Sequence, residues 1–304
     1  GELVALPTET VYGLAADALN PTAVKKIFTA KGRPQDNPLI VHVGSENQLS
    51  EIIEGEISLK AQLLIDRFWP GPLTIIFKKS SRVPAETSAG LDTVAVRMPA
   101  HPLILAVIQK SRLALAAPSA NTSGYPSPTK AEHVYADLNG KIPLILDGGS
   151  SEVGVESTVI DISGEKPVVL RPGGISRADI SKFLGEEVTL SKSLEKKSAP
   201  PAPGMKYRHY APEKNLYLFK AEELDEILNN LKSEKIALIA ARETELGSYN
   251  EEKLKVIRAF NRDEPEELGR KLFALLRELD ADPEIEDIYI EEVEAAGIGE
   301  AVMN

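Results

Sequence analysis

The amino-acid sequence predicts an α/β protein with two domains: an open, twisted mixed sheet with helices, followed by a smaller, doubly wound Rossmann-like unit. Two observations lead to this prediction. Short apolar runs of strand length alternate with stretches of helical periodicity, as is typical of α/β proteins. The chain also has 304 residues, whereas a single domain commonly has roughly 100–200.

In the first part of the chain, strands are expected at short runs of apolar and β-branched residues. Between them, Asn20 and Pro21 supply a helix N-cap and a first-turn proline, and the apolar residues that follow share one face. That helix ends at Lys31 and Gly32. The predicted strands are Leu3–Leu6, Leu39–Val43, Leu73–Phe77, Val94–Met98, Leu113–Ala117, Leu144–Leu146, Thr158–Ile162 and Val168–Leu170. Further helices are predicted at Ser58–Phe68, Pro102–Gln109, Thr129–Leu138 and Ser176–Leu184.

A proline-rich stretch, SAPPAPG at 198–204, keeps neither helical nor strand periodicity, because prolines enforce an extended backbone. Of the 21 prolines, only Pro265 and Pro283 lie beyond residue 212. The two sides of this stretch are therefore built differently. We predict a first domain over residues 1–197, a proline-rich linker over 198–212 and a second domain over 213–304.

Beyond the linker, strand-like and helical patterns alternate again, which predicts a small doubly wound sheet. The G-x-G-x-x-G pattern of dinucleotide sites is absent, since Gly297 and Gly299 follow the last strand and lack the remaining glycine. We therefore expect no dinucleotide here. The predicted strands are Leu216–Phe219, Ile236–Ala240, Val256–Phe260 and Ile285–Glu291, and the predicted helices are Ala221–Leu231 and Glu264–Leu279.

The net charge of −11 comes from the second domain. Residues 1–212 hold 23 basic and 22 acidic side chains, whereas residues 213–304 hold 12 basic and 24 acidic ones. An acidic domain repels phosphate backbones, so we expect no stable binding of nucleic acid by the whole molecule.

Composition excludes several kinds of site. The chain has no cysteine, which excludes disulfides, thiolate–zinc sites and a cysteine nucleophile. Its four histidines never fall at metal-ligand spacing, and neither a Walker A motif nor a G-x-S-x-G nucleophile elbow is present. No apolar run approaches the ~18 residues that cross a bilayer, and no leader precedes the first strand. We expect a cytoplasmic location and no membrane association.

The most suggestive polar loop runs from Lys31 to Pro38 and places Lys31 and Arg33 beside amide donors such as Asn37. A triphosphate with about four negative charges needs such cations, because a buried charge without a partner is unfavourable. A lysine followed by glycine is also what an ordinary helix end looks like, and the residues alone favour that simpler interpretation.

Other polar residues follow or lie on predicted strands, where open α/β sheets bind ligands. Ser119 and Asn121, in the segment 117–124, could bind a nucleotide or form a polar turn. Thr93 and Arg97 are four residues apart on a strand and face the same side, which suits either a ligand or an exposed polar face. The remaining candidates also have structural explanations as turn, sheet, core or linker residues: Thr10, His42, Ser157, Arg171 and Tyr207.

Five motifs occur in a fixed order: PTETVYGL at 7–14, KGRPQDNPL at 31–39, PSANTSG at 118–124, ESTVID at 156–161 and LRPG at 170–173. Together with their spacing, they resemble the YrdC-like threonylcarbamoyl-AMP synthases. The segment PGMKYRHYAP and the acidic second unit resemble the two-domain form of that family. The resemblance covers essentially the whole chain and implies a YrdC-like first domain with the linker over its active site. It also implies further terminal segments outside residues 1–304.

The resemblance implies an L-threonylcarbamoyladenylate synthase, a nucleotidyltransferase that makes threonylcarbamoyl-AMP and pyrophosphate from L-threonine, bicarbonate or CO2, and ATP with Mg²⁺. A partner transferase would then modify the tRNA adenosine next to the anticodon (t6A), so the synthase, expected to be a monomer, need not hold tRNA. Two alternatives stay open: an RNA-binding module whose basic loops grip phosphates, and an enzyme of similar chemistry acting on another amine or on carbamoyl phosphate.

The resemblance also implies the roles of individual residues. Arg97 suits the substrate carboxylate, because a guanidinium can bind it through two parallel hydrogen bonds. Mg²⁺ is expected to bridge phosphates without dedicated protein ligands, and the second domain is expected to act as a lid. Catalytic roles fall to Lys31, Arg33, Ser119 and Asn121. ATP contacts fall to Lys31, Arg33, Asn37, Thr93, Ser119, Ser127, Arg171 and Tyr207, and threonine contacts to Thr10, His42, Arg97, Ala117 through its backbone, and Ser157.

Overall fold

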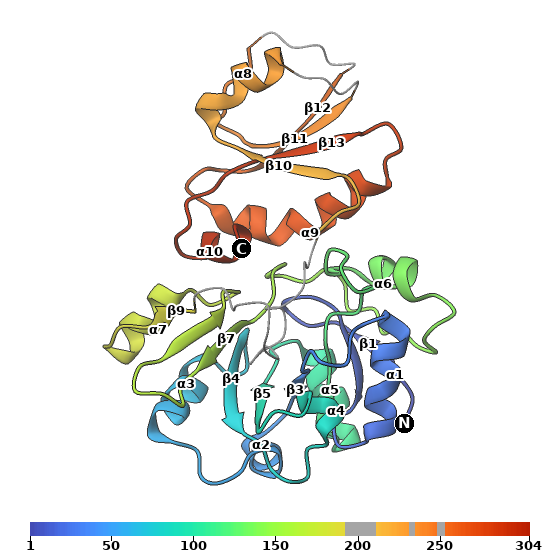
Figure 1. The fold of residues 1–304 in the computed structure, drawn as a ribbon, viewed down its shortest axis with the longest axis vertical. Helices are drawn as coiled ribbons and strands as arrows, with labels where there is room; N and C mark the ends of the chain where they lie inside the picture. Colours follow the sequence, from blue (N-terminus) through green and yellow to red (C-terminus); the bar gives the residue numbers. More distant parts are fainter. Residues whose placement is uncertain (192–210, 231–234, 248–252) are drawn as a thin grey trace.

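The structure is a computed structural model, and it describes residues 1–191, 211–230, 235–247 and 253–304. Two separate sheets form within these residues, one of nine strands and one of four (Figure 1). The nine-stranded sheet belongs to the first domain and ends at Leu190, and the four-stranded sheet begins at Asn215. Most of the predicted linker over 198–212, including Tyr207, lies outside the described residues.

The first sheet is mixed, with strand order β1-β2-β6-β3-β5-β4-β7-β8-β9. Seven of the eight predicted strands are confirmed, whereas Leu144–Leu146 makes only an isolated bridge through Ile145 to Ala5. β2 and β9 were not predicted, and β2 was missed because its sequence GLAAD lacks β-branched residues. The strands are β1 (Val4–Leu6), β2 (Gly13–Asp17), β3 (Ile40–His42), β4 (Leu73–Lys78), β5 (Thr93–Arg97), β6 (Leu115–Ala116), β7 (Thr158–Asp161), β8 (Val168–Arg171) and β9 (Thr189–Leu190).

The helices of the first domain follow their capping signals. Asn20 caps α1 by accepting a hydrogen bond from the Ala23 N–H at 3.1 Å, and Gly32 ends the helix in the left-handed conformation. α2 and α4 were not predicted, because one or two turns are too short to show a period of 3.6 residues. The helices are α1 (Pro21–Lys31), α2 (Glu46–Ile52), α3 (Leu59–Phe68), α4 (Ala85–Ser88), α5 (Pro102–Ser111), α6 (Ala131–Leu138) and α7 (Arg177–Leu184).

Alternation along the strands gives the first sheet two different faces. On one face, Val41, Ile75 and Val96 join buried residues of α1, α2 and α3 in the main hydrophobic core. On the other face, α5 covers only the region of β1, β2 and β6. The neighbouring part of that face, around Ile40 and Ala95, carries a smaller apolar cluster. Polar residues of β3 and β5 lie side by side on this part of the face, which we call the floor.

The second sheet is entirely parallel, with strand order β10-β13-β11-β12. α8 packs on one face through a cluster that contains Leu224 and Leu238, and α9 packs on the other through Leu272 and Ile290. Helices on both faces of a parallel sheet confirm the doubly wound prediction. The elements are β10 (Asn215–Phe219), a 3-10 turn (Ala221–Glu223), α8 (Leu224–Asn229), β11 (Ile236–Ala241), β12 (Leu254–Phe260), α9 (Pro265–Ala281), β13 (Asp287–Glu291) and α10 (Gly299–Val302).

α9 lies between the second sheet and the first domain (Figure 1). Gly154 of the first domain lies against its backbone, and a Cβ built on this glycine would come within 2.5 Å of the Arg270 Cα. Val11, in the loop after β1, is part of the apolar cluster that α9 forms. The two domains therefore meet in close packing. None of the helices in the described ranges is long and apolar enough to cross a membrane.

Two alanine substitutions separate the effect of this close packing on stability from the effect of backbone strain. Gly154 and Gly140 share a left-handed conformation, with φ of +77° and +74°, but a Cβ on Gly140 would meet nothing within 4 Å. We expect Gly140→Ala to cost about 1 kcal/mol of stability from strain alone, and Gly154→Ala to cost about 2–5 kcal/mol because α9 must also move. Chemical denaturation of the full chain measures both, and equal losses would show that α9 does not approach Gly154 this closely.

Candidate active site

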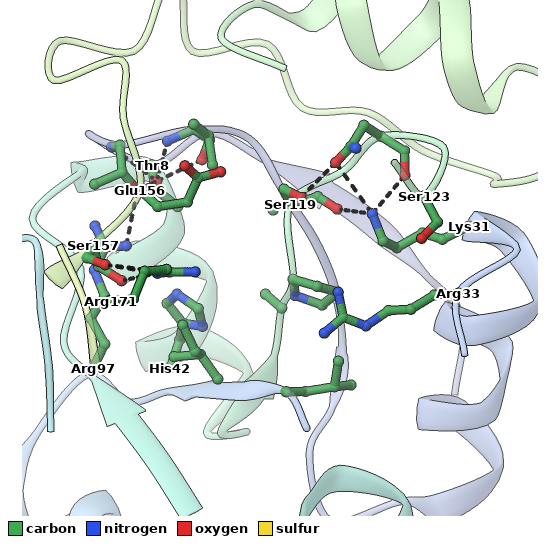
Figure 2. Close-up of a pocket in the computed structure, with 18 of the residues that line it drawn as sticks. Thr8, Lys31, Arg33, His42, Arg97, Ser119, Ser123, Glu156, Ser157 and Arg171 are labelled. Carbon is green, nitrogen blue, oxygen red and sulfur yellow. Dashed lines mark hydrogen bonds between the residues drawn. The ribbon is translucent and has the colours of Figure 1, made fainter. Parts of the chain in front are cut away.

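A polar pocket lies over the uncovered floor of the first sheet, and most of the predicted residues line it (Figure 2). The pocket is formed by the loops after β1 and β6, the end of α1, the strands β3 and β5, and the ends of β7 and β8 that meet there. The lining residues are Thr8, Thr10, Val11, Gly13, Lys31, Arg33, Leu39, Ile40, His42, Arg97, Ala117, Pro118, Ser119, Asn121, Ser123, Gly124, Tyr125, Glu156, Ser157 and Arg171.

One wall of the pocket is organised by the ammonium group of Lys31, which is 2% exposed. Its Nζ donates to the carbonyl oxygens of Ser119 and Asn121 at 2.5 and 2.6 Å, and it lies 3.3 Å from Asn121 Oδ1. Burial lowers the pKa of Lys31 well below its usual value, and repulsion from Arg33 acts in the same direction. The three oxygen acceptors oppose this shift by stabilising the charged form. Lys31 therefore fixes the shape of the loop after β6.

Asn121 completes the same network from within the loop after β6. Its amide nitrogen donates to the carbonyl oxygens of Thr122 and Tyr125 at 2.9 and 2.8 Å, while its Oδ1 accepts from the Ser119 hydroxyl at 2.5 Å. In this arrangement Asn121 holds the loop in place, and Ser119 and Ser123 border the cavity (Figure 2).

Arg33 reaches into the pocket from the same side as Lys31 (Figure 2). Its Nη2 donates to the Pro38 carbonyl oxygen at 3.1 Å, which ties the side chain to the loop that follows α1. Asn37, in that loop, is 1% exposed, and neither atom of its side-chain amide has a hydrogen-bond partner within the described part of the chain. A buried amide in this state is usually paired with an ordered water, an ion or a ligand.

The opposite wall is built around Arg97, which is 3% exposed. Its Nη2 pairs with Glu9 at 2.5 Å, its Nη1 donates to the Thr10 hydroxyl at 2.9 Å, and its Nε donates to the Gly71 carbonyl oxygen at 3.1 Å. Burial alone would raise the pKa of Glu9, but attraction to Arg97 outweighs it and the pKa is lowered. These contacts use three of the five guanidinium donors, and Arg97 also lines the pocket.

His42 lies beside Arg97, because the two residues are register partners on the parallel strands β3 and β5. Burial and the positive charge of Arg97 lower the pKa of His42 to about 3, so its imidazole is neutral near pH 7. Its Nδ1 is buried and has no hydrogen-bond partner among the described residues. His42 therefore presents a neutral imidazole to the pocket.

Arg171, at the end of β8, lies on the same wall as Arg97 and His42. Its Nη2 donates to the carbonyl oxygen and hydroxyl of Ser157 at 2.7 and 3.1 Å, and the Ser157 hydroxyl is 2.8 Å from that of Thr74. Glu156 precedes Ser157 and accepts a 2.5 Å hydrogen bond from Ser127. Among the described residues that line the pocket, Glu156 alone carries a carboxylate.

The structure thus gathers ten of the fourteen predicted residues around one pocket: Thr10, Lys31, Arg33, His42, Arg97, Ala117, Ser119, Asn121, Ser157 and Arg171. Asn37 and Ser127 lie behind the lining, next to Arg33 and Glu156 respectively. Thr93 shares a face of β5 with Arg97, as predicted, but lies at the other end of the strand and does not line the pocket. Tyr207 falls outside the described residues.

Sequence reasoning did not assign Thr8, Ser123 or Glu156, which also line the pocket. Glu9 was missed as well, although it pairs with Arg97. All four lie within the motifs PTETVYGL, PSANTSG and ESTVID, one or two residues from assigned positions. That proximity was the available signal, but it does not show which neighbour of an assigned residue faces the cavity.

Comparison with known proteins covers both domains. A family model described as telomere recombination, Sua5_yciO_yrdC, matches residues 1–173. The model described as threonylcarbamoyl-AMP synthase, C-terminal domain, matches residues 175–304.

Curated relatives and solved structures agree with these matches. Threonylcarbamoyl-AMP synthase of Pyrococcus abyssi is 47% identical over 100% of this chain and 89% of its own length. That of Bacillus subtilis is 44% identical over 100% and 88%. One of Vibrio parahaemolyticus is 34% identical over 174 residues, which are 57% of this chain and 93% of that protein. The crystal structure of P. abyssi Sua5 complexed with L-threonine has a TM-score of 0.90 at 46% identity, covering 99% of this chain and 88% of that one. This chain therefore belongs to the threonylcarbamoyl-AMP synthase family, in the form that carries the C-terminal domain.

Proposed function

We propose that this chain makes L-threonylcarbamoyl-AMP and pyrophosphate from L-threonine, bicarbonate or CO2, and ATP, as a nucleotidyltransferase. The observation that carries the proposal is the buried Arg97, which lines the pocket together with a neutral imidazole and several hydroxyl groups. A relative with a TM-score of 0.90 was solved with L-threonine bound, which supports threonine as the ligand of this wall.

The wall around Arg97 suits each polar group of threonine. The guanidinium binds the carboxylate, because two N–H donors can meet its two oxygens. Thr10, His42, Ser157 and the Ala117 backbone then surround the amine and hydroxyl. Because His42 is neutral, it can accept a hydrogen bond from the amine without repelling its positive charge.

The wall around Lys31 suits ATP. Arg33 and the backbone shaped by Lys31 lie across the cavity from Arg97 (Figure 2), where they can bind an anionic ligand, and Arg171 adds a further cation from the wall around Arg97. Asn37, whose buried amide has no hydrogen-bond partner among the described residues, adds a donor and an acceptor near Arg33. We keep Ser119, Asn121, Ser127, Thr93 and Tyr207 as proposed members of the ATP site.

The reaction we propose has two steps. The threonine ammonium group first loses one proton to water. The neutral amine then adds to CO2, forming an N–C bond and releasing a second proton, and gives a carbamate. A carbamate oxygen then bonds to the ATP α-phosphorus while the bond to the β-phosphate oxygen breaks and pyrophosphate leaves. Buried cations on both walls hold the two anionic substrates together and oppose their mutual repulsion.

Mg²⁺ fits this pocket as an ion that arrives with ATP. Within the described residues no group of three histidine or acidic side chains could hold a metal, whereas Mg²⁺ usually uses one or two carboxylates plus phosphate oxygens and water. Glu156 is the lining carboxylate that could contact it. When bound, Mg²⁺ neutralises phosphate charge.

The product of this reaction is an activated threonylcarbamoyl group, which a separate transferase would pass to tRNA to form t6A. The acidic second domain, with 12 basic and 24 acidic residues, supports a synthase that does not itself hold tRNA. We propose that the enzyme is a monomer that acts in the cytoplasm.

The direct test is release of pyrophosphate by the purified chain. We expect release when ATP, Mg²⁺, bicarbonate and L-threonine are all present, and a product whose mass is that of threonylcarbamoyl-AMP. Equal release without threonine, or with another amine in its place, would contradict the substrate. Tight RNA binding with a steep salt dependence that ATP does not reduce would instead favour an RNA-binding module.

Lys31→Met removes the charge that shapes the ATP wall. We expect turnover to fall by about 10²–10³, the scale of losing one preorganised charge contact, and stabilisation by ATP in a thermal shift assay to be lost. Lys26→Met is the matched control, because Lys26 lies on the same helix, is 41% exposed and pairs with Glu2 away from the pocket. Normal turnover of Lys31→Met would remove Lys31 from the site.

The neutral state of His42 predicts a pH dependence of stability. Its pKa is about 3 in the folded protein and about 6.5 in the unfolded chain, so the unfolded chain binds more protons between these values. Stability then falls as the pH is lowered from about 6.5, by up to ~1.4 kcal/mol per pH unit from this residue.

Urea denaturation of the wild type and of His42→Gln at pH 7.5, 6.5, 5.5 and 4.5 measures this contribution. The wild type should lose stability more steeply below pH 6.5. A residual slope is expected in the variant, because burial also lowers the pKa of His133, to about 4. Parallel curves for the two proteins would show that His42 is protonated in the folded state.

A further inference from the structure

The contact between the domains includes an ion pair that is almost fully buried. Arg277 on α9 and Asp137 on α6 are 11% and 9% exposed in their side chains. Two parallel hydrogen bonds join them, Nη1 to Oδ1 at 3.0 Å and Nη2 to Oδ2 at 2.9 Å. Nε and Nη2 of Arg277 also donate to the Pro126 carbonyl oxygen at 3.0 and 2.6 Å. A planar guanidinium holds such partners in a fixed geometry.

Both partners of Arg277 lead to the loop that forms the ATP wall. Asp137 Oδ2 also accepts the Thr122 N–H at 3.0 Å, and the Thr122 carbonyl oxygen accepts from Asn121, which borders Lys31. Pro126 follows Tyr125 at the other end of the same turn. Arg277 thus holds both ends of the segment 122–126, whose middle residues Ser123, Gly124 and Tyr125 line the pocket.

A second ion pair between the domains has no such connection. Arg177 on α7 donates to Glu300 on α10 at 2.7 and 3.2 Å, and its Nη1 donates to the Val188 carbonyl oxygen. Neither Arg177 nor Glu300 lines the pocket. The two pairs therefore differ in what they touch, although both join the same two domains.

We propose that Arg277 is a positioning residue for the reaction: from the second domain, it holds the loop 122–126 in the shape that binds ATP. This inference rests on the proposed function, since it takes the wall around Lys31 to be the ATP site. It makes docking of the second domain and binding of ATP mutually dependent, because two equilibria that share a structural element affect each other equally. The hydrogen bonds of Arg97 itself go to Glu9, Thr10 and Gly71, which lie outside this network.

The experiment compares Arg277→Ala with Arg177→Ala in the full chain. Each variant removes one ion pair between the domains, but only Arg277→Ala releases the loop. We expect Arg277→Ala to raise the KM for ATP about tenfold, to leave the KM for threonine within about twofold, and to reduce stabilisation by ATP but not by threonine in a thermal shift assay. Arg177→Ala should keep wild-type values for both substrates.

Two further variants keep the test informative if Arg277→Ala does not fold. Arg277→Lys keeps the charge but cannot make two parallel hydrogen bonds, and Asp137→Asn keeps an acceptor for Thr122 but loses the charge; both should shift the KM for ATP in the same direction. Equal effects of Arg277→Ala and Arg177→Ala would show a general docking role and overturn the proposal, as would unchanged ATP binding in all variants. Failure of the proposed function would be seen separately, in the wild type. ATP would then not stabilise the wild-type protein, and the protein would release no pyrophosphate.

Discussion

The buried ammonium group of Lys31 is the interaction on which the pocket depends. A charge removed from water is strongly unfavourable unless protein oxygens replace its hydration. Here three oxygens do so, and all of them come from Ser119 and Asn121. The loop after β6 must therefore turn its carbonyl groups toward the end of α1. The shape of one whole wall follows from satisfying a single charge.

The charge of the pocket lining is opposite in sign to the net charge of the protein. The chain carries a net charge of −11, yet the lining contains four cations, Lys31, Arg33, Arg97 and Arg171, against Glu156. Field lines in such a cavity are concentrated by its low-dielectric walls, so anionic ligands are drawn toward it. Each cation is already bonded to protein oxygens, so it keeps its position before a ligand arrives. This arrangement lowers the cost of reorganisation when charge moves during a reaction.

Much of the fold and part of the candidate site could be predicted from sequence, because both depend on patterns among residues that are close together in the chain. The cap at Asn20, the alternation that puts Thr93 and Arg97 on one face of a strand, and the motif spacing each act within a few residues. β2 could not be predicted in this way, because its residues 13–17 become a strand only through pairing with β1 and β6. The role of Asn121 in holding the loop after β6 could not be predicted either, since this role depends on Lys31, 90 positions earlier in the chain. Arg277 shows the same limit: its sequence places it on a helix, but only the contact between domains relates it to the pocket.

The relatives differ in whether they are long enough to carry a second domain. The V. parahaemolyticus synthase is matched over 93% of its length by only 174 residues, which leaves no room for a second domain of this size. In this chain, however, Val11 joins the apolar cluster of α9 while also lining the pocket. Because Val11 follows Thr10, the second domain packs beside the wall around Arg97 as well as against the loop beyond Asn121. The carbamate and the mixed anhydride of the proposed reaction both react with water, so walls that are held together would exclude solvent better than walls that move separately. The second domain thus packs beside both walls of the pocket.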